Sequence, residues 1–217
     1  MHVLIVLTYY RPHTSGLTIY AERLAQGLVR AGHQVTILTS RYLHRLPGTE
    51  EINGVRVVRA PVLFRLSKGV IMPTFGFLAW KLAGEADVIS LHLPQFDAAG
   101  VALRGRMLRK PTVLTYHCDL QLPPTPFNKV VNQVTNGMNA LAGAFSHRVV
   151  AYTQDFADAS PYLQRFADKL RVIPPPIELP PASPSGTAAF AKMHNPNGNR
   201  PIRSEEHTSE LQSRQVI

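Results

Sequence analysis

Short aliphatic runs alternate with amphipathic segments along this chain up to residue 173, and few folds are compatible with such a pattern. Residues 3–7 read Val-Leu-Ile-Val-Leu, a run typical of a strand that is covered on both faces of a parallel sheet. Apolar residues then recur at helical spacing over residues 17–31, Gly32 marks a helix end, and residues 35–38 predict a second buried strand. Residues 1–40 therefore predict a right-handed β-α-β unit.

The alternation continues beyond this unit. Helices are expected at residues 73–83, 96–108, 127–145 and 156–166, and strands at residues 55–58, 87–91, 112–116, 147–152 and 170–173. The fold class is therefore α/β, a Rossmann-like, doubly wound parallel sheet of about seven strands. A length of 217 residues suits one such domain with a tail better than two complete domains.

A proline-rich stretch ends the rhythm and divides the chain. Six of residues 174–184 are proline, a composition that favours extended, semi-rigid backbone. We assign residues 1–174 to the α/β domain and residues 175–202 to a linker and the start of a further domain, with a short helix at 188–193. Residues 203–217 show neither apolar period and resemble an in-frame translation of a sequencing adapter, so we exclude them as an artefact.

The charge balance and the cysteine content limit which binding partners and which cellular compartment we expect. Lysine and arginine outnumber acidic residues by 23 to 14, a surplus that suits phosphate, nucleic acid or anionic lipid. The single cysteine, Cys118, excludes an internal disulfide framework and favours a reducing compartment. The apolar N-terminal run is too short for a signal peptide, and no stretch is long enough to span a bilayer. We expect a cytoplasmic protein.

The basic residues concentrate in residues 41–81 and 104–110. Six apolar residues interleave with the first group, namely Phe64, Leu66, Ile71, Phe75, Phe77 and Trp80. A mixture of this kind suits peripheral contact with an anionic membrane at the inner face of the plasma membrane, although such runs are often only solvated faces. No nucleic-acid-binding motif is present, so nucleic acid is not an expected partner.

The loop after the first strand is the first candidate site. Ser15 and Gly16 precede the first helix, at the carboxyl edge of the sheet where doubly wound folds bind ligands. Gly16 lets backbone N–H groups approach a phosphate, and the helix N-terminus adds unpaired donors and partial positive charge. A diphosphate would fit there, unless Gly16 only eases a tight turn. The dinucleotide fingerprint is absent, which counts against an NAD or FAD enzyme.

The second candidate site follows the strand at residues 112–116. His117 can donate to a phosphate or a sugar hydroxyl, and Asp119 can orient the imidazole or accept a hydroxyl proton. A purely structural His117 is the alternative. We expect Cys118 to pack inward, and His92 to stand alone after its own strand, so the sequence nominates no metal site.

Together these segments resemble the amino-terminal domain of family 4 retaining glycosyltransferases, which have the two-domain GT-B fold. The resemblance runs from Met1 to about Asn199 and is carried by residues 6–16, 20–28, 31–39, 115–119 and 172–177. It implies a hexosyl-type transferase that moves a sugar from a nucleotide-diphosphate-sugar donor to a glycan or lipid-linked acceptor, with no metal or other cofactor.

The resemblance also implies roles for individual residues. Gly16 maps to the second glycine of a pair near the donor diphosphate, and Ser15 stands in place of the first. His117 maps beside the donor sugar, with Asp119 in support. The family's carboxyl-terminal domain supplies a glutamate pair spaced by eight positions, and no two glutamates of this chain have that spacing. We therefore expect this 217-residue chain to be an amino-terminal fragment that is nearly inactive alone.

Two other interpretations remain open at this stage. One is a non-catalytic module that binds anionic membrane or nucleic acid through the basic residues. The other is a different GT-B-like nucleotide-sugar enzyme, such as an epimerase.

Overall fold

The structure is a computed structural model that describes residues 1–66, 69–118, 125–177 and 183–194. The chain divides into two compact units, Met1–Ile177 and Glu178–Ile217. The second unit contributes one described helix, α7 (Pro184–His194), whose start is capped where the Gly186 N–H donates to Oγ of Ser183 at 3.1 Å. The first unit contains the sheet.

The first unit is built on one sheet of eight strands. Their order is β10 (Leu170–Val172), β9 (Arg148–Ala151), β8 (Thr112–Tyr116), β7 (Val88–Leu93), β1 (His2–Val6), β2 (Gln34–Arg41), β4 (Val55–Pro61) and β3 (Thr49–Ile52). All neighbouring pairs are parallel except β3 with β4. The α/β doubly wound fold is therefore confirmed, and the seven predicted strands all form.

Three strands were not predicted. β3 has the sequence Thr-Glu-Glu-Ile, in which charge interrupts any apolar run, as is common for a strand at a sheet edge. β5 (Phe64–Leu66) and β6 (Gly69–Ile71) form a separate two-stranded antiparallel pair. Each has only three residues, too short for a recognisable period.

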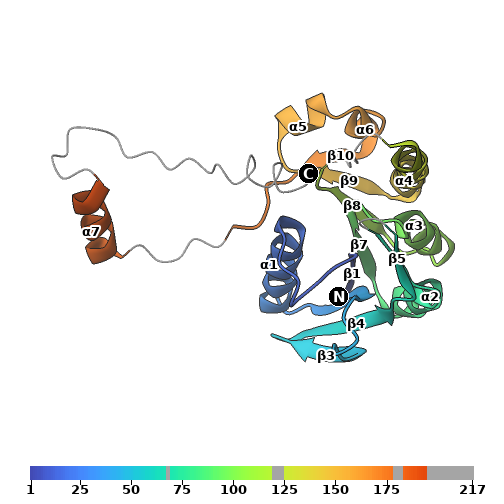
Figure 1. Cartoon of the computed structure of the whole chain (residues 1–217), viewed down its shortest axis with the longest axis horizontal. Coiled ribbons are helices and arrows are strands. Elements are labelled where there is room, and N and C mark those ends of the chain that lie inside the picture. Colours follow the sequence, from blue (N-terminus) through green and yellow to red (C-terminus); the bar gives the residue numbers. More distant parts are fainter. Residues whose placement is uncertain (67–68, 119–124, 178–182, 195–217) are drawn as a thin grey trace. The chain divides into compact units, whose positions relative to one another are not determined.

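Helices cover both faces of the sheet (Figure 1). On one face, Ala21 and Ala25 of α1 (Gly16–Arg30) pack on Val3 and Ile5 of β1. On the other face, Leu4 of β1 belongs to a core shared with α2 (Phe75–Glu85), α3 (Ala98–Met107) and α4 (Pro126–Phe145). Successive β1 side chains thus enter opposite cores, which explains why the run is apolar throughout.

The predicted helix at residues 156–166 is wrong as a single element. Two short helices, α5 (Gln154–Ala159) and α6 (Pro161–Gln164), lie there, followed by a 3₁₀ turn at Ala167–Lys169. Ser160 between them is extended, with a ψ of 117°. The reason is Pro161, because a proline has no N–H to donate and disfavours helical backbone in the residue before it.

The strand order places the candidate loops at one edge. From β1 the chain proceeds outward to β2 and β4 in one direction, and from β7 to β8, β9 and β10 in the other. The carboxyl ends of β1 and β7 therefore flank the point where the winding reverses, which is where open α/β sheets bind ligands. Among the described residues, no helix combines the length and apolar character needed to cross a bilayer.

Candidate functional site

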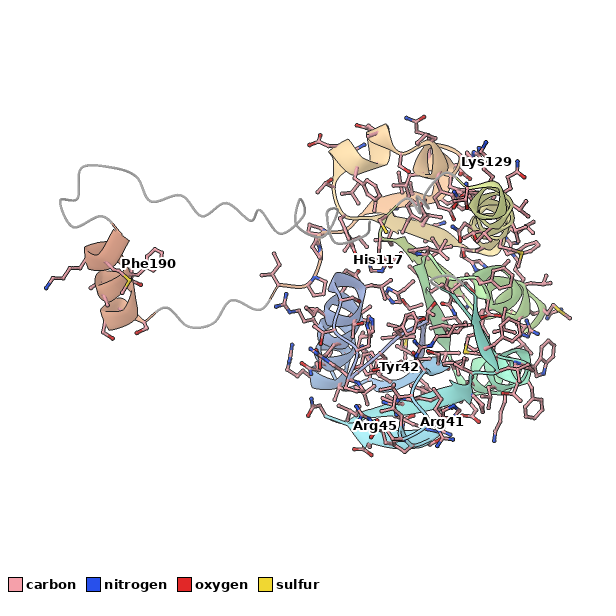
Figure 2. The ribbon with its side chains drawn as sticks, viewed as in Figure 1. Arg41, Tyr42, Arg45, His117, Lys129 and Phe190 are labelled. Atoms are coloured by element: carbon pink, nitrogen blue, oxygen red, sulfur yellow. The ribbon has the colours of Figure 1, made fainter. Side chains whose placement is uncertain are left out.

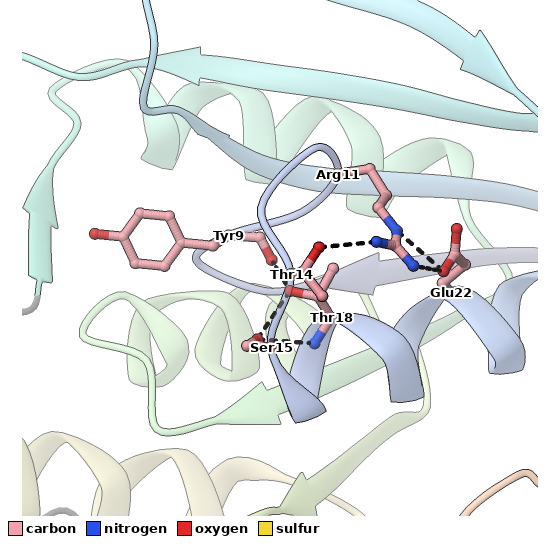
Figure 3. Close-up of polar contacts among 6 residues, drawn as sticks. All are labelled: Tyr9, Arg11, Thr14, Ser15, Thr18 and Glu22. Atoms are coloured by element: carbon pink, nitrogen blue, oxygen red, sulfur yellow. Dashed lines mark hydrogen bonds and ion pairs between the residues drawn. The ribbon is translucent and has the colours of Figure 1, made fainter. Parts of the chain in front are cut away.

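Hydrogen bonds hold the loop between β1 and α1 in place (Figure 3). The Ser15 hydroxyl caps the helix by accepting the Thr18 N–H at 3.2 Å. Arg11 donates to Oγ1 of Thr14 at 3.0 Å and from Nε to Glu22 at 3.0 Å. These bonds fix the loop to the first two turns of α1. No acidic residue lies in the first turn of the helix, so no carboxylate there would repel an anion.

Gly16 is not required by the backbone or by packing. Its φ lies outside the left-handed region, and a Cβ added to it would meet no neighbour within 4 Å. The interpretation that Gly16 only eases a tight turn therefore loses its physical basis. The Ser15 side chain, by contrast, is occupied by the helix cap and does not line the cavity described below.

A polar strip replaces the apolar core on part of the α1 side of the sheet. In β7, Leu91 and Leu93 belong to the core under α2, α3 and α4, so alternation turns Ser90 and His92 toward α1. His117 follows β8 and lies at the same edge (Figure 2). The α1 side is therefore apolar over β1, β2 and β4 and polar over the ends of β7 and β8.

Two imidazoles and a phenol form a hydrogen-bonded row in this strip. His92 is fully buried, and its Nδ1 lies 2.9 Å from Nε2 of His117, while its Nε2 lies 3.3 Å from Oγ of Ser90. The Tyr152 hydroxyl, just beyond β9, meets the other ring nitrogen of His117. The Tyr20 ring of α1 packs edge-on against His92 and His117, with centroids 5.5 and 5.0 Å away.

Burial keeps this row uncharged. It lowers the pKa of His117 to about 4 and, together with the adjacent His117, holds the pKa of His92 well below 6.5. Burial also raises the pKa of Tyr152, which stays a protonated phenol at neutral pH. A neutral imidazole has one donor and one acceptor nitrogen, so the row satisfies itself when every proton points toward Ser90 or every proton points toward Tyr152.

The row opens into a cavity of about 460 Å³ that joins both candidate loops. Its lining residues are Gly16, Leu17, Ile19, Tyr20, Arg23, His117, Cys118, Tyr152, Pro175 and Pro176. Gly16 and His117 are far apart in sequence yet border the same hollow. Arg23 spans one side of it and donates to the Pro176 carbonyl at 3.4 Å, so two prolines assigned to the linker take part in the wall.

Two sequence expectations at this edge need correction. Cys118 is exposed rather than packed inward, because the strand ends at Tyr116 and the alternation of side chains stops there. His92 does not stand alone after its strand, because it lies within β7 and contacts His117. Asp119 lies outside the described residues. Among the residues described, no three His, Cys, Asp or Glu side chains gather closely enough to hold a metal ion.

Sequence reasoning did not assign three polar residues of the cavity, Tyr20, Arg23 and Tyr152, to the site. Tyr20 and Arg23 lie four and seven positions after Gly16. This spacing places all three on one helix face, so the sequence could have predicted that they lie close together. Tyr152 carried a weaker signal: it follows a buried strand at the same sheet edge, but its contact with His117 depends on how β9 pairs with β8.

Comparison with known proteins places these features in a family. The model of Glycosyltransferase Family 4 matches residues 14–179. An uncharacterized glycosyltransferase of Methanocaldococcus jannaschii is 45% identical over 60 residues, which are 27% of this chain and 15% of that protein.

Two solved structures share the fold. Anabaena HepE in complex with UDP aligns with a TM-score of 0.59 and 18% identity over 89% of this chain and 50% of its own. Sucrose-phosphate synthase from Thermosynechococcus elongatus aligns with a TM-score of 0.51 and 17% identity over 80% of this chain and 47% of its own. The chain thus spans about half the length of these structures.

Proposed function

This chain belongs to glycosyltransferase family 4, and from that premise we propose that it is the acceptor-side domain of an enzyme that transfers a hexosyl group with retention of configuration. The donor is a nucleotide diphosphate sugar, and the acceptor is a glycan or a lipid-linked glycan. One observation carries the proposal: Gly16 at the start of α1 and His117 beyond β8 line the same cavity.

The diphosphate binds at the start of α1. Free space at the Cα of Gly16 lets the first-turn N–H groups approach an anion, and the helix adds partial positive charge there. Arg23 supplies a full charge on the same cavity wall. The UDP bound to the Anabaena structure supports this choice of ligand. Ser15 contributes its backbone, since its hydroxyl caps the helix.

His117 contacts the transferred sugar. Its Nε2 faces buried His92, so a sugar hydroxyl reaches the imidazole by taking the place of the Tyr152 hydroxyl at Nδ1. A neutral His117 offers the sugar a hydrogen bond without adding charge beside an oxocarbenium-like centre. Asp119 supports the imidazole in this proposal.

The remaining chemistry belongs to a second domain. We assign residues 1–174 to the acceptor-side domain, 175–202 to the linker and the start of that second domain, and 203–217 to an artefactual tail. Backbone amides and basic side chains of the second domain stabilise the departing diphosphate, with no metal required. This chain alone is then nearly inactive. The whole enzyme works in the cytoplasm.

The test compares variants of the whole protein with a nucleotide-sugar donor and an acceptor glycan. His117→Ala should abolish transfer while circular dichroism stays unchanged, and the product anomer should match the donor. Salt-sensitive binding to DNA or vesicles, with no transfer by the unmodified protein, would instead support a non-catalytic module. Conversion of the donor sugar to its epimer would support the epimerase alternative.

A further inference from the structure

The row of Ser90, His92, His117 and Tyr152 has one closed end and one open end. His92 is fully buried, and the ring of Tyr20 packs over it from α1 with centroids 5.5 Å apart. Ser90, beyond His92, is buried as well. At the other end His117 and Tyr152 line the cavity. A ligand in the cavity therefore meets the row at its His117 and Tyr152 end, while the Ser90 end lies within the protein.

The contact between the two imidazoles makes their protons point the same way. Burial keeps both rings neutral, so each has one N–H donor and one bare acceptor nitrogen. Nδ1 of His92 and Nε2 of His117 are 2.9 Å apart, and one of these two nitrogens must donate to the other. If His92 donates, His117 has its proton on Nδ1, toward Tyr152. If His117 donates, His92 has its proton on Nε2, toward Ser90.

The closed end of the row favours the first arrangement. There the Ser90 O–H donates to the bare Nε2 of His92, 3.3 Å away. In the second arrangement Ser90 would accept instead and its own proton would need another acceptor, yet among the described residues this hydroxyl forms no other hydrogen bond. An unpaired buried donor is costly. The open end adds no such cost, because the Tyr152 oxygen accepts from His117 while its O–H turns to water or a ligand in the cavity.

We propose that Ser90 and His92 are positioning residues that fix the tautomer of His117, with the proton on Nδ1 and an N–H donor presented to the cavity. The group that binds His117 is then a hydrogen-bond acceptor, such as an oxygen lone pair. Nε2, the basic nitrogen, is engaged by His92, so His117 does not take a proton from a substrate hydroxyl. That the bound oxygen belongs to the transferred sugar rests on the proposed function, whereas the tautomer rests on the row alone.

Nitrogen NMR of the 217-residue chain, with isotope-labelled histidine, tests this tautomer directly. A ring nitrogen that carries a proton has a chemical shift far from that of a bare one, so each tautomer has its own pattern. The signals of His117 are those that disappear in His117→Asn. At neutral pH they should show a protonated Nδ1 and a bare Nε2, with this form in excess by about fivefold or more. A protonated Nε2 overturns the proposal.

Two substitutions of Ser90 test its part in the row. Ser90→Ala removes the hydroxyl, so Nε2 of His92 is unpaired with either tautomer and the two forms of His117 should become comparable in population. Ser90→Thr keeps the hydroxyl on a residue type that suits a strand, and it should keep the proton on Nδ1. Circular dichroism checks the fold of both variants, and the spectrum of the unmodified chain decides the direction of the protons without them. An undiminished excess of the Nδ1–H form in folded Ser90→Ala would overturn the role of Ser90.

Sugar transfer by the whole protein measures the consequence for the reaction. In Ser90→Ala, kcat/KM for the nucleotide sugar should fall about two- to tenfold, the value of one neutral hydrogen bond, and Ser90→Thr should restore it. Equal kcat/KM in the two variants would contradict a role of the tautomer in transfer. No transfer by the unmodified whole protein would contradict the proposed function instead, while the NMR spectrum of His117 would still decide the tautomer.

Discussion

His117 has no free ring nitrogen in this structure, and that fact sets its chemistry. His92 occupies one nitrogen and Tyr152 the other, so the imidazole is held in place and uncharged before any ligand arrives. In the proposed function a substrate hydroxyl replaces the phenol, and a preorganised donor or acceptor of this kind then needs little rearrangement. Burial keeps His117 uncharged, and the Tyr152 hydroxyl is the group that holds its Nδ1 in place.

Tyr152→Phe should leave the pKa of His117 well below its ordinary value near 6.5, because burial is what lowers it to about 4. The substitution keeps the ring that packs with Tyr20 and His117 and so keeps the imidazole buried, while it removes the hydroxyl that meets Nδ1. Proton NMR titration of His117 measures the pKa. A pKa near 6.5 in the variant would show that the Tyr152 hydroxyl, rather than burial, keeps His117 uncharged.

Acidification should destabilise the fold through the same residue. Between pH 6.5 and about 4 the unfolded chain protonates His117 and the folded chain does not, so the free energy of unfolding falls by up to about 3 kcal/mol as pH drops. Urea denaturation at several pH values measures this slope, and His117→Asn should reduce it without abolishing it, because buried His92 also resists protonation. Asp97, whose pKa is raised to about 6, acts in the opposite direction but equally in both proteins.

Individual residues show how far the sequence could predict the site. Gly16 and His117 were identifiable because each follows a buried strand at the carboxyl edge. The contact between His92 and His117 was not, because it depends on the register of β7 with β8, in which His92 pairs with Thr115. Ser90 and His92 alternate with apolar residues in β7, and this alternation alone could have predicted that one face of the strand is polar.

Most helices and strands lie where the pattern of apolar residues predicted them, and each error in these predictions has a local cause. Long buried strands and the 20-residue α4 were predictable because packing and periodicity agree there. The charged edge strand β3 and the break at Pro161 were missed because a period cannot reveal an edge strand or a helix that restarts.

Two glycines of α4 provide an internally controlled test of this packing. A Cβ at Gly143 would collide with the Phe166 ring and the Tyr162 hydroxyl, whereas one at Gly137 would meet nothing within 4 Å. Gly143→Ala should therefore cost about 1–3 kcal/mol of unfolding free energy, and Gly137→Ala should add about 0.5–1 kcal/mol through helix propensity. Urea denaturation decides, and equal effects of the two variants would contradict the packing of α4 described above.

Under the proposed function the molecule as a whole supplies one wall of a binding cleft, and nucleotide affinity tests this. The diphosphate would contact the start of α1 and Arg23 in this chain, and the proposed second domain would supply the other wall. UDP at about a hundred times its dissociation constant stabilises a protein by about 2.7 kcal/mol, enough to raise the melting temperature of the whole protein by several degrees. The same concentration should shift this chain by about one degree or less. Arg23→Gln should reduce the shift in the whole protein, and Arg30→Gln, at the far end of α1, should not. A full-sized shift in this chain alone would mean that one domain binds the nucleotide, and the two-walled cleft would have to be abandoned.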